Sequence, residues 1–397
     1  MAYVNALAAL ALVFVPHVAS NASPPDARVV FETKEGKETE RPLEELSLRD
    51  PRKEGAHFVR FLGLPRGEAP KGARARLELS SGDELFAAAR GGQSESLQLE
   101  LIGDVSLNLS IDHLAALRFD DRIPAGWVES IGPAPEGDRI YRRKQSLLDR
   151  IDGSVVEFST EGIVFESVLG EKTFAWTEVA ALFLEVFDEG GDERTEGVPA
   201  VVDLVDQGRL RGELVGIDRA YCTLKTLGAQ LELPLWAVSE VFVDDGSLAF
   251  LSDLEPSEVD EGSPFGDDLG MSWPYVRDRS VTGAPLTVGG RVHSRGLGVH
   301  APSRLVWKLD GSWNELLGQC ALDDQVLRLP ERGSVQFRVS VDGKNVWESP
   351  VVRGGDRALT LPPIDLKGAT TLALEVDMAT DFYVADRADW LRMLLVK

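Results

Sequence analysis

Hydrophobic and polar residues alternate along most of the first 250 residues, in short runs that turn residues separate. In residues 201–243, for example, the runs are interrupted at Asp206-Gln207-Gly208, Gly216 and Gly228. Alternation with a period of two predicts strands with one buried face, and Gly and Asp predict the turns between them. The pattern therefore predicts an all-β chain.

The same order of strands and turns recurs along the chain, in residues 77–119, 146–187 and 201–243, and a degenerate copy starts at Arg28. The equivalent positions in the three clear copies are Leu85, Ile151 and Leu210. Each copy contains about five short strands, which a small SH3-like or Sm-like barrel closes on itself so that no free edge remains. The region resembles tandem Sm-like barrels.

From Phe250 onward the texture of the sequence changes and predicts a second kind of fold. Residues 334–341 alternate with Val335, Phe337 and Val339 on one face, turn at Asp342-Gly343 and return through Trp347, as a hairpin does. Residues 371–378 alternate in the same way. Paired antiparallel strands of this kind predict a β-sandwich.

The N-terminus predicts export. An apolar run from Ala6 to Val15 is followed by Pro16 and by small residues ending at Ser20-Asn21-Ala22, which is typical of a signal peptide with a cleavage site. No Lys or Arg precedes the run, so a buried N-terminal strand or helix is the alternative. The run is too short for a membrane-spanning helix, which needs about 20 apolar residues, so no membrane insertion after cleavage is expected. The predicted localisation is secreted or periplasmic.

Composition excludes several classes of function. The formal net charge is -23, and nucleic-acid binders need basic surfaces, so DNA, RNA and anionic membranes are not expected partners. Two cysteines, Cys222 and Cys320, are too few for a disulfide scaffold and are expected to be buried.

Several phrases in the last third of the chain resemble the carbohydrate-binding module family NPCBM, which is also known from family 98 glycosyl hydrolases. The phrases are Leu251–Leu254, Arg295–Ser303, Gly333–Val339, Asp342-Gly343-Lys344 and Ala388-Asp389-Trp390. One departure is Arg387, where the family's terminal phrase usually has His. The resemblance covers roughly residues 250 to 397.

The resemblance implies a galactose-binding-like jelly-roll sandwich that recognises carbohydrate, either a galactose-type sugar or another glycan. Sandwiches of this kind often hold a structural calcium ion through loop carbonyls and a carboxylate. Asp386 and Asp389 are the candidate calcium ligands in this sequence.

Sugar recognition requires an aromatic ring for the apolar face of the sugar and polar groups for its hydroxyls. The predicted sugar-binding residues are Trp273, Tyr275, His293, Arg295, His300, Asp389 and Trp390. Tyr383 is a further aromatic candidate, and Trp390 within Ala-Asp-Trp also suits a core position. His300 could contact the sugar or brace its loop.

Metal binding and catalysis are weaker interpretations of the two histidines. His293 and His300 lie in a Gly-rich stretch without Cys or spaced carboxylates, which disfavours a zinc site. No Gly-x-Ser-x-Gly elbow accompanies them, so a serine hydrolase is not predicted. No catalytic residue is therefore assigned.

The predicted organisation joins tandem small SH3/Sm-like barrels to a jelly-roll sandwich. The expected boundaries are a signal peptide at 1–22, a barrel region at 28–121 with a degenerate first copy, a linker at 122–144, barrel repeats at 145–189 and 200–246, and the NPCBM-like module at 250–397. The predicted function is that of an exported, non-catalytic carbohydrate-binding protein. The alternatives are an envelope scaffold that binds envelope proteins without sugar, and a protein associated with glycoside hydrolase activity.

Overall fold

The computed structural model describes residues 26–128, 130–186, 197–262, 273–380 and 382–397. These residues form strands and short 3-10 helices, without any α-helix among them. The all-β prediction is confirmed. The predicted signal peptide lies outside the described residues, and within them no helix is long and apolar enough to cross a membrane. The 3-10 helices are η1 (Leu43–Glu45), η2 (Pro51–Glu54), η3 (Ile111–His113), η4 (Asp120–Arg122), η5 (Ala125–Trp127), η6 (Leu235–Ala237), η7 (Leu251–Asp253) and η9 (Asp324–Arg328).

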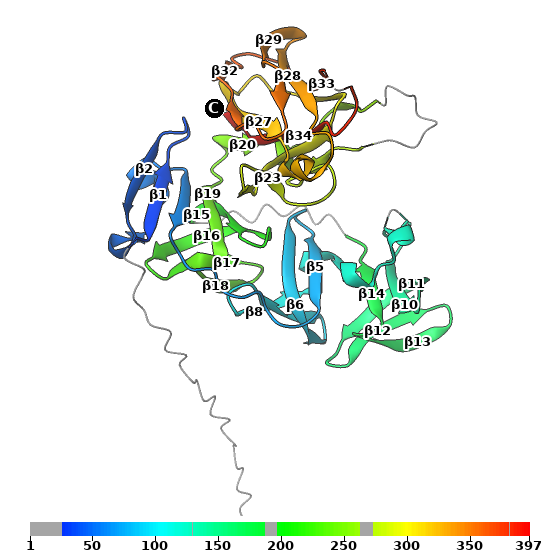
Figure 1. Ribbon diagram of the computed structural model, residues 1–397. Coiled ribbons are helices and arrows are strands. Elements are labelled where there is room, and N and C mark those ends of the chain that lie inside the picture. Colours follow the sequence, from blue (N-terminus) through cyan, green and yellow to red (C-terminus); the bar gives the residue numbers. More distant parts are fainter. Residues whose placement is uncertain (1–25, 129, 187–196, 263–272, 381) are drawn as a thin grey trace, which may run out of the picture.

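Three consecutive five-strand units fill most of residues 74–243 (Figure 1). The first unit is β5 (Arg74–Leu79), β6 (Glu84–Gln93), β7 (Ser96–Leu101), β8 (Val105–Ser110) and β9 (Leu114–Arg118). The second is β10 (Asp138–Lys144), β11 (Leu147–Phe158), β12 (Gly162–Ser167), β13 (Gly170–Ala175) and β14 (Val179–Phe183). The third is β15 (Val198–Leu204), β16 (Arg209–Asp218), β17 (Tyr221–Thr226), β18 (Ala229–Pro234) and β19 (Val238–Val243).

The second strand of each unit is long and carries a β-bulge. The register shifts between Ala89 and Gly91 in β6, between Val155 and Glu157 in β11, and between Leu214 and Gly216 in β16. A bulge bends its strand and increases the local twist. The bend curls each unit, and its fifth strand pairs with its first.

Fifth strands also join the units to one another. β9 pairs with β14, which creates a ten-stranded sheet from the first and second units. β19 pairs with β4 (Phe58–Leu62), so β1 (Arg28–Glu32), β2 (Glu38–Pro42) and β3 (Ser47–Leu48) belong with the third unit. The expected barrel region at 28–121 is therefore wrong as one region, because its two halves lie in different sheets.

The predicted linker at 122–144 is wrong for its last seven residues, Asp138–Lys144, which form β10. Ile140 and Tyr141 are buried in this strand, and the Pro-rich signal ends at Pro135. The repeat predicted at 145–189 consequently begins earlier, at Asp138.

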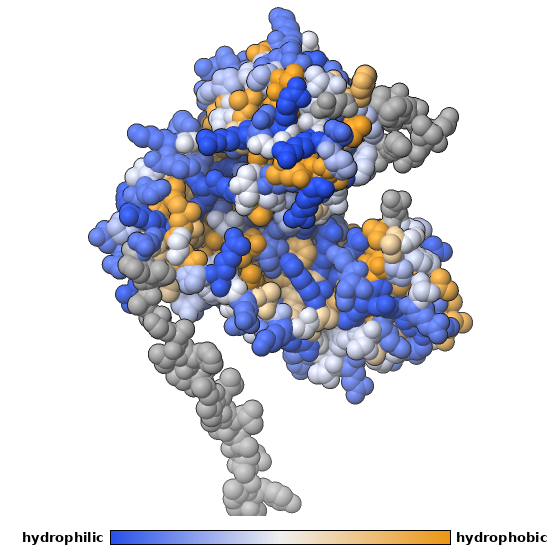
Figure 2. Space-filling model, in the orientation of Figure 1, coloured by the Kyte–Doolittle hydropathy of each residue, from blue (hydrophilic) through white to orange (hydrophobic). Residues whose placement is uncertain are grey.

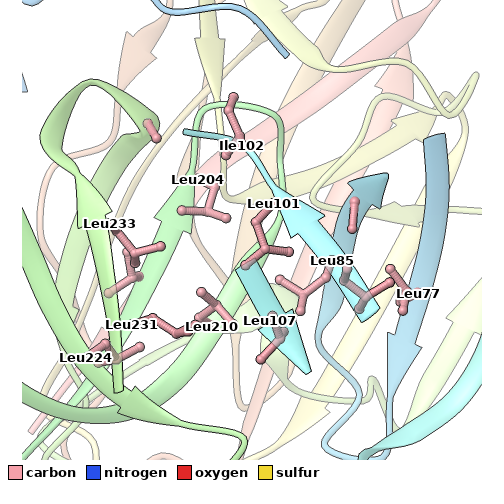
Figure 3. Packing of buried hydrophobic residues seen from close by; sticks show 14 of the residues in the cluster. Leu77, Leu85, Leu101, Ile102, Leu107, Leu204, Leu210, Leu224, Leu231 and Leu233 are labelled. Atoms are coloured by element: carbon pink, nitrogen blue, oxygen red, sulfur yellow. The ribbon is translucent and has the colours of Figure 1, made fainter. Parts of the chain in front are cut away.

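The two sheets share one hydrophobic core. Figure 3 shows Leu77, Leu85 and Leu101 of the first unit close to Leu204 and Leu210 of the third. Leu85 and Leu210, which the repeat pattern makes equivalent, are both completely buried. Burying a leucine side chain contributes about 2 kcal/mol, so this shared core fixes the first unit against the third.

The C-terminal part is a sandwich of two sheets (Figure 1). One sheet has the order β22 (Val276–Arg277), β25 (Gly296–His300), β34 (Arg387–Val396), β27 (Glu315–Leu322) and β31 (Leu359–Thr360), with β20 (Leu248–Phe250) beside β34 and β32 (Ile364–Asp365) beside β27. The other has the order β21 (Glu258–Asp260), β26 (Ser303–Lys308), β33 (Thr371–Met378), β28 (Ser334–Val341) and β29 (Lys344–Glu348), with β30 (Val352–Arg353) beside β28. A separate hairpin consists of β23 (Leu286–Val288) and β24 (Arg291–His293).

The sandwich core lies between these sheets, and the apolar residues that alternate along the strands fill it. Val335, Phe337 and Val339 are completely buried, and β28 pairs with β29 across the predicted Asp342-Gly343 turn. The predicted hairpin is confirmed. The ring of Phe337 meets Trp390 edge-on, with ring centroids 4.9 Å apart.

A network of buried ion pairs joins the sandwich to the third unit. Arg295 of the sandwich donates from Nε to Asp203 of β15 at 3.0 Å and from Nη1 to Asp253 at 2.6 Å. Arg209 donates to Asp203 at 2.8 Å and to Asp278 at 2.8 Å. Burial alone would raise the pKa of Asp203, but Arg295 and Arg209 outweigh it and hold this pKa well below its usual range. The carboxylate is therefore ionised in the folded chain.

A second set of ion pairs lies nearby, where Arg392 of β34 donates to Glu240 at 2.6 Å and to Glu32 at 3.2 Å. Both acceptors belong to the N-terminal sheets. The sandwich is thus held by pairs of charged side chains whose members are 69 to 360 residues apart in sequence.

Candidate functional site

The Gly-rich stretch around His300 forms an inner strand of the sandwich, β25, whose two faces differ. Leu297 and Val299 point into the core together with Ala388 and Trp390 of the paired strand β34. His300 pairs with Arg387 in this register. Directly opposed residues of antiparallel strands project from the same face, so His300 and Arg387 lie side by side on the outer face of the sheet.

Gly298 allows another segment to cover this outer face. A Cβ at Gly298 would overlap the backbone of Arg279, Ser280 and Val281. The residue must therefore be glycine for the loop from Asp278 to Thr282 to pack against β25.

Aromatic rings enclose His300. The ring of Trp273 stacks on the imidazole with centroids 5.4 Å apart and an interplanar angle of 14°. Tyr383 contacts the imidazole with a centroid distance of 4.5 Å. The Cζ atom of Arg387 lies 5.6 Å from the centroid of the Trp273 ring. We call Trp273, His300, Tyr383 and Arg387 the Trp273 cluster.

His300 is a neutral brace within this cluster. Its Nδ1 lies 2.9 Å from the carbonyl oxygen of Ala301, which can only accept, so Nδ1 carries the proton and Nε2 is left as an acceptor. Burial and, to a smaller extent, Arg387 lower the pKa of His300, although the Ala301 carbonyl opposes the shift. The side chain is 5% exposed, and two rings contact it. This geometry suits a residue that braces its loop, and a sugar contact through His300 stays a prediction.

The solvent-facing part of the site comes from Trp273 and from the loop at residues 382–386. Trp273 is half-buried, and Phe382 is 77% exposed beside the buried Tyr383. Phe382 and Ala385 have φ values of 53° and 61°, a left-handed conformation that few non-glycine residues adopt. The loop is anchored where the Ser334 amide donates to Asp386 Oδ1 at 2.9 Å. An exposed aromatic ring on a locally strained, anchored loop is typical of a binding surface.

Polar side chains position Arg387 through a hydrogen-bond network centred on Gln325. Gln325 Nε2 donates to Ser280 Oγ at 2.7 Å, and Gln325 Oε1 accepts from Thr282 at 2.7 Å and from Arg387 at 3.4 Å. The guanidinium is half-buried.

Three predicted sugar contacts are wrong because their side chains have no exposed surface. Arg295 is 0% exposed and belongs to the ion-pair network with Asp203 and Asp253. Trp390 is 0% exposed and lies in the sandwich core, and Asp389 is 0% exposed on the strand between β25 and β27. These residues shape the fold around the site and do not reach solvent.

The other two predicted contacts lie outside the Trp273 cluster. Tyr275 is half-buried against the sandwich core, and its hydroxyl donates to Glu255 at 3.3 Å. His293 is 8% exposed in β24, where burial together with Arg291, Arg392 and Arg60 lowers its pKa to about 4. His293 is thus a neutral residue near the interface with the N-terminal sheets.

The two carboxyl groups predicted for calcium, Asp386 and Asp389, are both 0% exposed. Oδ1 of Asp386 accepts the Ser334 amide, whereas Asp389 lies next to Asp323. Burial first, and then the charge of Asp323, raise the pKa of Asp389 well above its usual range. Among the described residues, no three His, Cys, Asp or Glu side chains gather as a metal site would require. The calcium hypothesis combines loop carbonyls with a single carboxylate, so it stays a prediction.

Comparison with known families places the cluster in a recognised domain. A family model described as "NPCBM/NEW2 domain" matches residues 248–396. Residues 248–396 are an NPCBM/NEW2 domain. The resemblance derived from the sequence motifs is confirmed, with the start shifted by two residues.

Curated and solved relatives align with parts of the chain. Alpha-1,3-galactosidase B of Akkermansia muciniphila is 34% identical over 116 residues, which are 28% of this chain and 14% of the galactosidase. The chain therefore spans about a seventh of that relative. A CBM51 module from Clostridium perfringens GH95, solved in complex with methyl-galactose, has 22% identity and a TM-score of 0.33, covering 38% of this chain and 99% of the module. A structure of CBM51-2 with GlcNAc and INT domains from Clostridium perfringens ZmpB has 19% identity and a TM-score of 0.34, covering 52% of this chain and 39% of that chain.

Proposed function

We propose that this protein is an exported, non-catalytic carbohydrate-binding protein that docks a glycan on the Trp273 cluster of its NPCBM/NEW2 domain. One observation carries the proposal. The cluster places a partly open tryptophan beside a guanidinium, and the exposed Phe382 directly precedes Tyr383 of the cluster, on a domain whose family binds carbohydrate.

The chemistry of the cluster suits a sugar. The apolar face of a pyranose ring packs on an aromatic face, and its hydroxyl groups need donors and acceptors at the rim. Trp273 and Phe382 supply apolar surface, and Arg387 supplies donors. The buried His300 and Tyr383 hold Trp273 in place, which limits the entropy lost on binding.

The N-terminal sheets support a spacer or platform role in this proposal. Their shared core and the ion pairs to Arg295 and Arg392 hold the sandwich in one orientation. The N-terminal segment at 1–22 supports export to the cell surface or periplasm, because its composition is that of a signal peptide.

The test uses the full chain, because the sandwich buries Arg295 against Asp203 and an isolated sandwich would expose this charge. Wild-type protein and the Trp273→Ala variant are applied to a glycan array, with Trp347→Ala on β29 as a matched tryptophan control. Release of reducing sugar is measured on every glycan that is bound.

We expect binding by the wild type and by Trp347→Ala, loss of binding by Trp273→Ala, and no release of sugar. Sugar release would support the alternative of glycoside hydrolase activity. Absence of binding on the array, together with envelope proteins that co-purify with the chain, would support the scaffold alternative.

A further inference from the structure

Arg387 distinguishes this site from a surface built only for neutral sugars. It stands directly across from His300 and beside Trp273 on the outer face of the sheet. An arginine carries a permanent charge, whereas His300 next to it is neutral.

The charge of Arg387 lacks a carboxylate partner among the described residues. Its hydrogen bond is the 3.4 Å contact to the neutral amide of Gln325. Six other arginines of the domain form ion pairs with carboxylates: Arg277, Arg279, Arg295, Arg304, Arg338 and Arg392.

The nearby acidic residues do not neutralise Arg387. Asp386 accepts the Ser334 amide through Oδ1, and Asp324 accepts the amides of Gly289 and Gly290. Asp323 accepts the amides of Thr287 and Gln325, and burial, followed by the charge of Asp323, raises the pKa of its neighbour Asp389. Among the described residues none of these four carboxyl groups forms an ion pair with Arg387, so the guanidinium keeps its remaining donors for another acceptor.

The overall charge of the protein does not prevent an anion from reaching this site. Residues 248–397 contain 22 Asp and Glu against 16 Lys and Arg, whereas the whole chain has 65 against 42. Charges are screened beyond about 8 Å at physiological ionic strength, so the nearest cation dominates at contact. Figure 2 shows that the domain, in the upper part of the view, presents hydrophilic surface interspersed with apolar patches.

We propose that the Trp273 cluster prefers acidic glycans, in which a sugar carries a carboxylate or sulfate group that accepts hydrogen bonds from Arg387. The inference rests on the proposed function, because it names the class of glycan that the same surface binds. A guanidinium and a carboxylate or sulfate form paired, charge-assisted hydrogen bonds, while the sugar ring packs on Trp273.

The test compares matched sugars on the full chain. Dissociation constants are measured for galactose against galacturonate and for glucose against glucuronate, each pair differing at C6, and for galactose 6-sulfate as a second anionic group. We expect the acidic member to bind about tenfold more tightly or better. Added NaCl should reduce this ratio and leave the affinity for neutral sugar unchanged.

Variants assign the preference to one side chain. Arg387→Gln should bring the acidic-to-neutral ratio close to one, and Arg387→Lys should retain part of it. Arg338→Gln, which removes a paired arginine on β28, serves as the control and should keep the wild-type ratio.

Two kinds of failure are distinguishable. Binding of neutral sugars with an acidic-to-neutral ratio near one in the wild type, or a ratio that survives Arg387→Gln, overturns the preference and leaves the proposed function standing. Absence of binding to every sugar, here and on the glycan array, overturns the proposed function and the preference together.

Discussion

Replacing Asp203 with Asn should strongly destabilise the folded chain. Asp203 is 4% exposed and accepts charge-assisted hydrogen bonds from Arg209 at 2.8 Å and from Arg295 at 3.0 Å. Hydrogen bonds to charged groups contribute about 1.5–3 kcal/mol each, and removing one partner of a buried ion pair costs about 3–5 kcal/mol. The substitution leaves Arg295 buried with less negative charge beside it, so a loss of about 3–5 kcal/mol is expected.

The assay is urea denaturation of the full chain, followed by tryptophan fluorescence. The control is Glu375→Gln, which removes the partner of the 42% exposed Arg304 and should cost less than about 1 kcal/mol. An Asp203→Asn effect as small as that of the control would refute the idea that these ion pairs hold the sandwich in place.

The pH dependence of the unfolding free energy provides a second test with the Asp203→Asn variant. The folded pKa of Asp203 is lowered, so its stabilising effect is present above the unfolded pKa of about 3.9 and is lost as the pH falls toward the folded pKa. The difference between wild type and Asp203→Asn should therefore be constant from pH 5 to 7 and narrow below about pH 4.

Three further outcomes are expected. Gly298→Ala should destabilise the chain by about 1–3 kcal/mol in urea denaturation and weaken glycan binding, because the new Cβ overlaps the loop that covers β25. Gly126 has open space around it, so the control variant Gly126→Ala should change neither the stability nor the binding. Asp389→Asn should flatten the pH profile of the unfolding free energy. The folded pKa of Asp389 is raised, so the wild type should lose stability as the pH rises above about 4. An identical profile for the variant would contradict the raised pKa of Asp389. Chelation with EDTA should lower the thermal midpoint, because the predicted structural calcium would bind only the folded chain, and an unchanged midpoint would contradict the calcium prediction.

Local patterns in the sequence were sufficient for the strands and for the domain family. Alternation predicted the β28–β29 hairpin, and the motifs around Arg295–Ser303 indicated the domain at 248–396. The linker was misplaced because three prolines dominate residues 124–135, while the strand Asp138–Lys144 that follows contains five charged residues and a short apolar centre.

The composition of the site was harder to predict than its position. Trp273 and His300, both predicted to bind sugar, are in contact with each other. Arg295 was assigned to sugar because nothing local shows that Asp203, 92 residues earlier, pairs with it. Arg387 was noted only as a departure from the family. The exposed Phe382 was missed, although an apolar run from Phe382 to Val384 between polar residues is a usable signal for a binding loop.

The most direct test of the central claim is a titration of the full chain with the tightest-binding glycan from the array, for wild type, Trp273→Ala and Trp347→Ala. The account predicts that Trp273→Ala weakens binding at least about tenfold, as loss of an aromatic platform should, while Trp347→Ala binds as the wild type does. Equal affinity of Trp273→Ala and wild type, with both proteins folded, would place the glycan elsewhere and contradict the account.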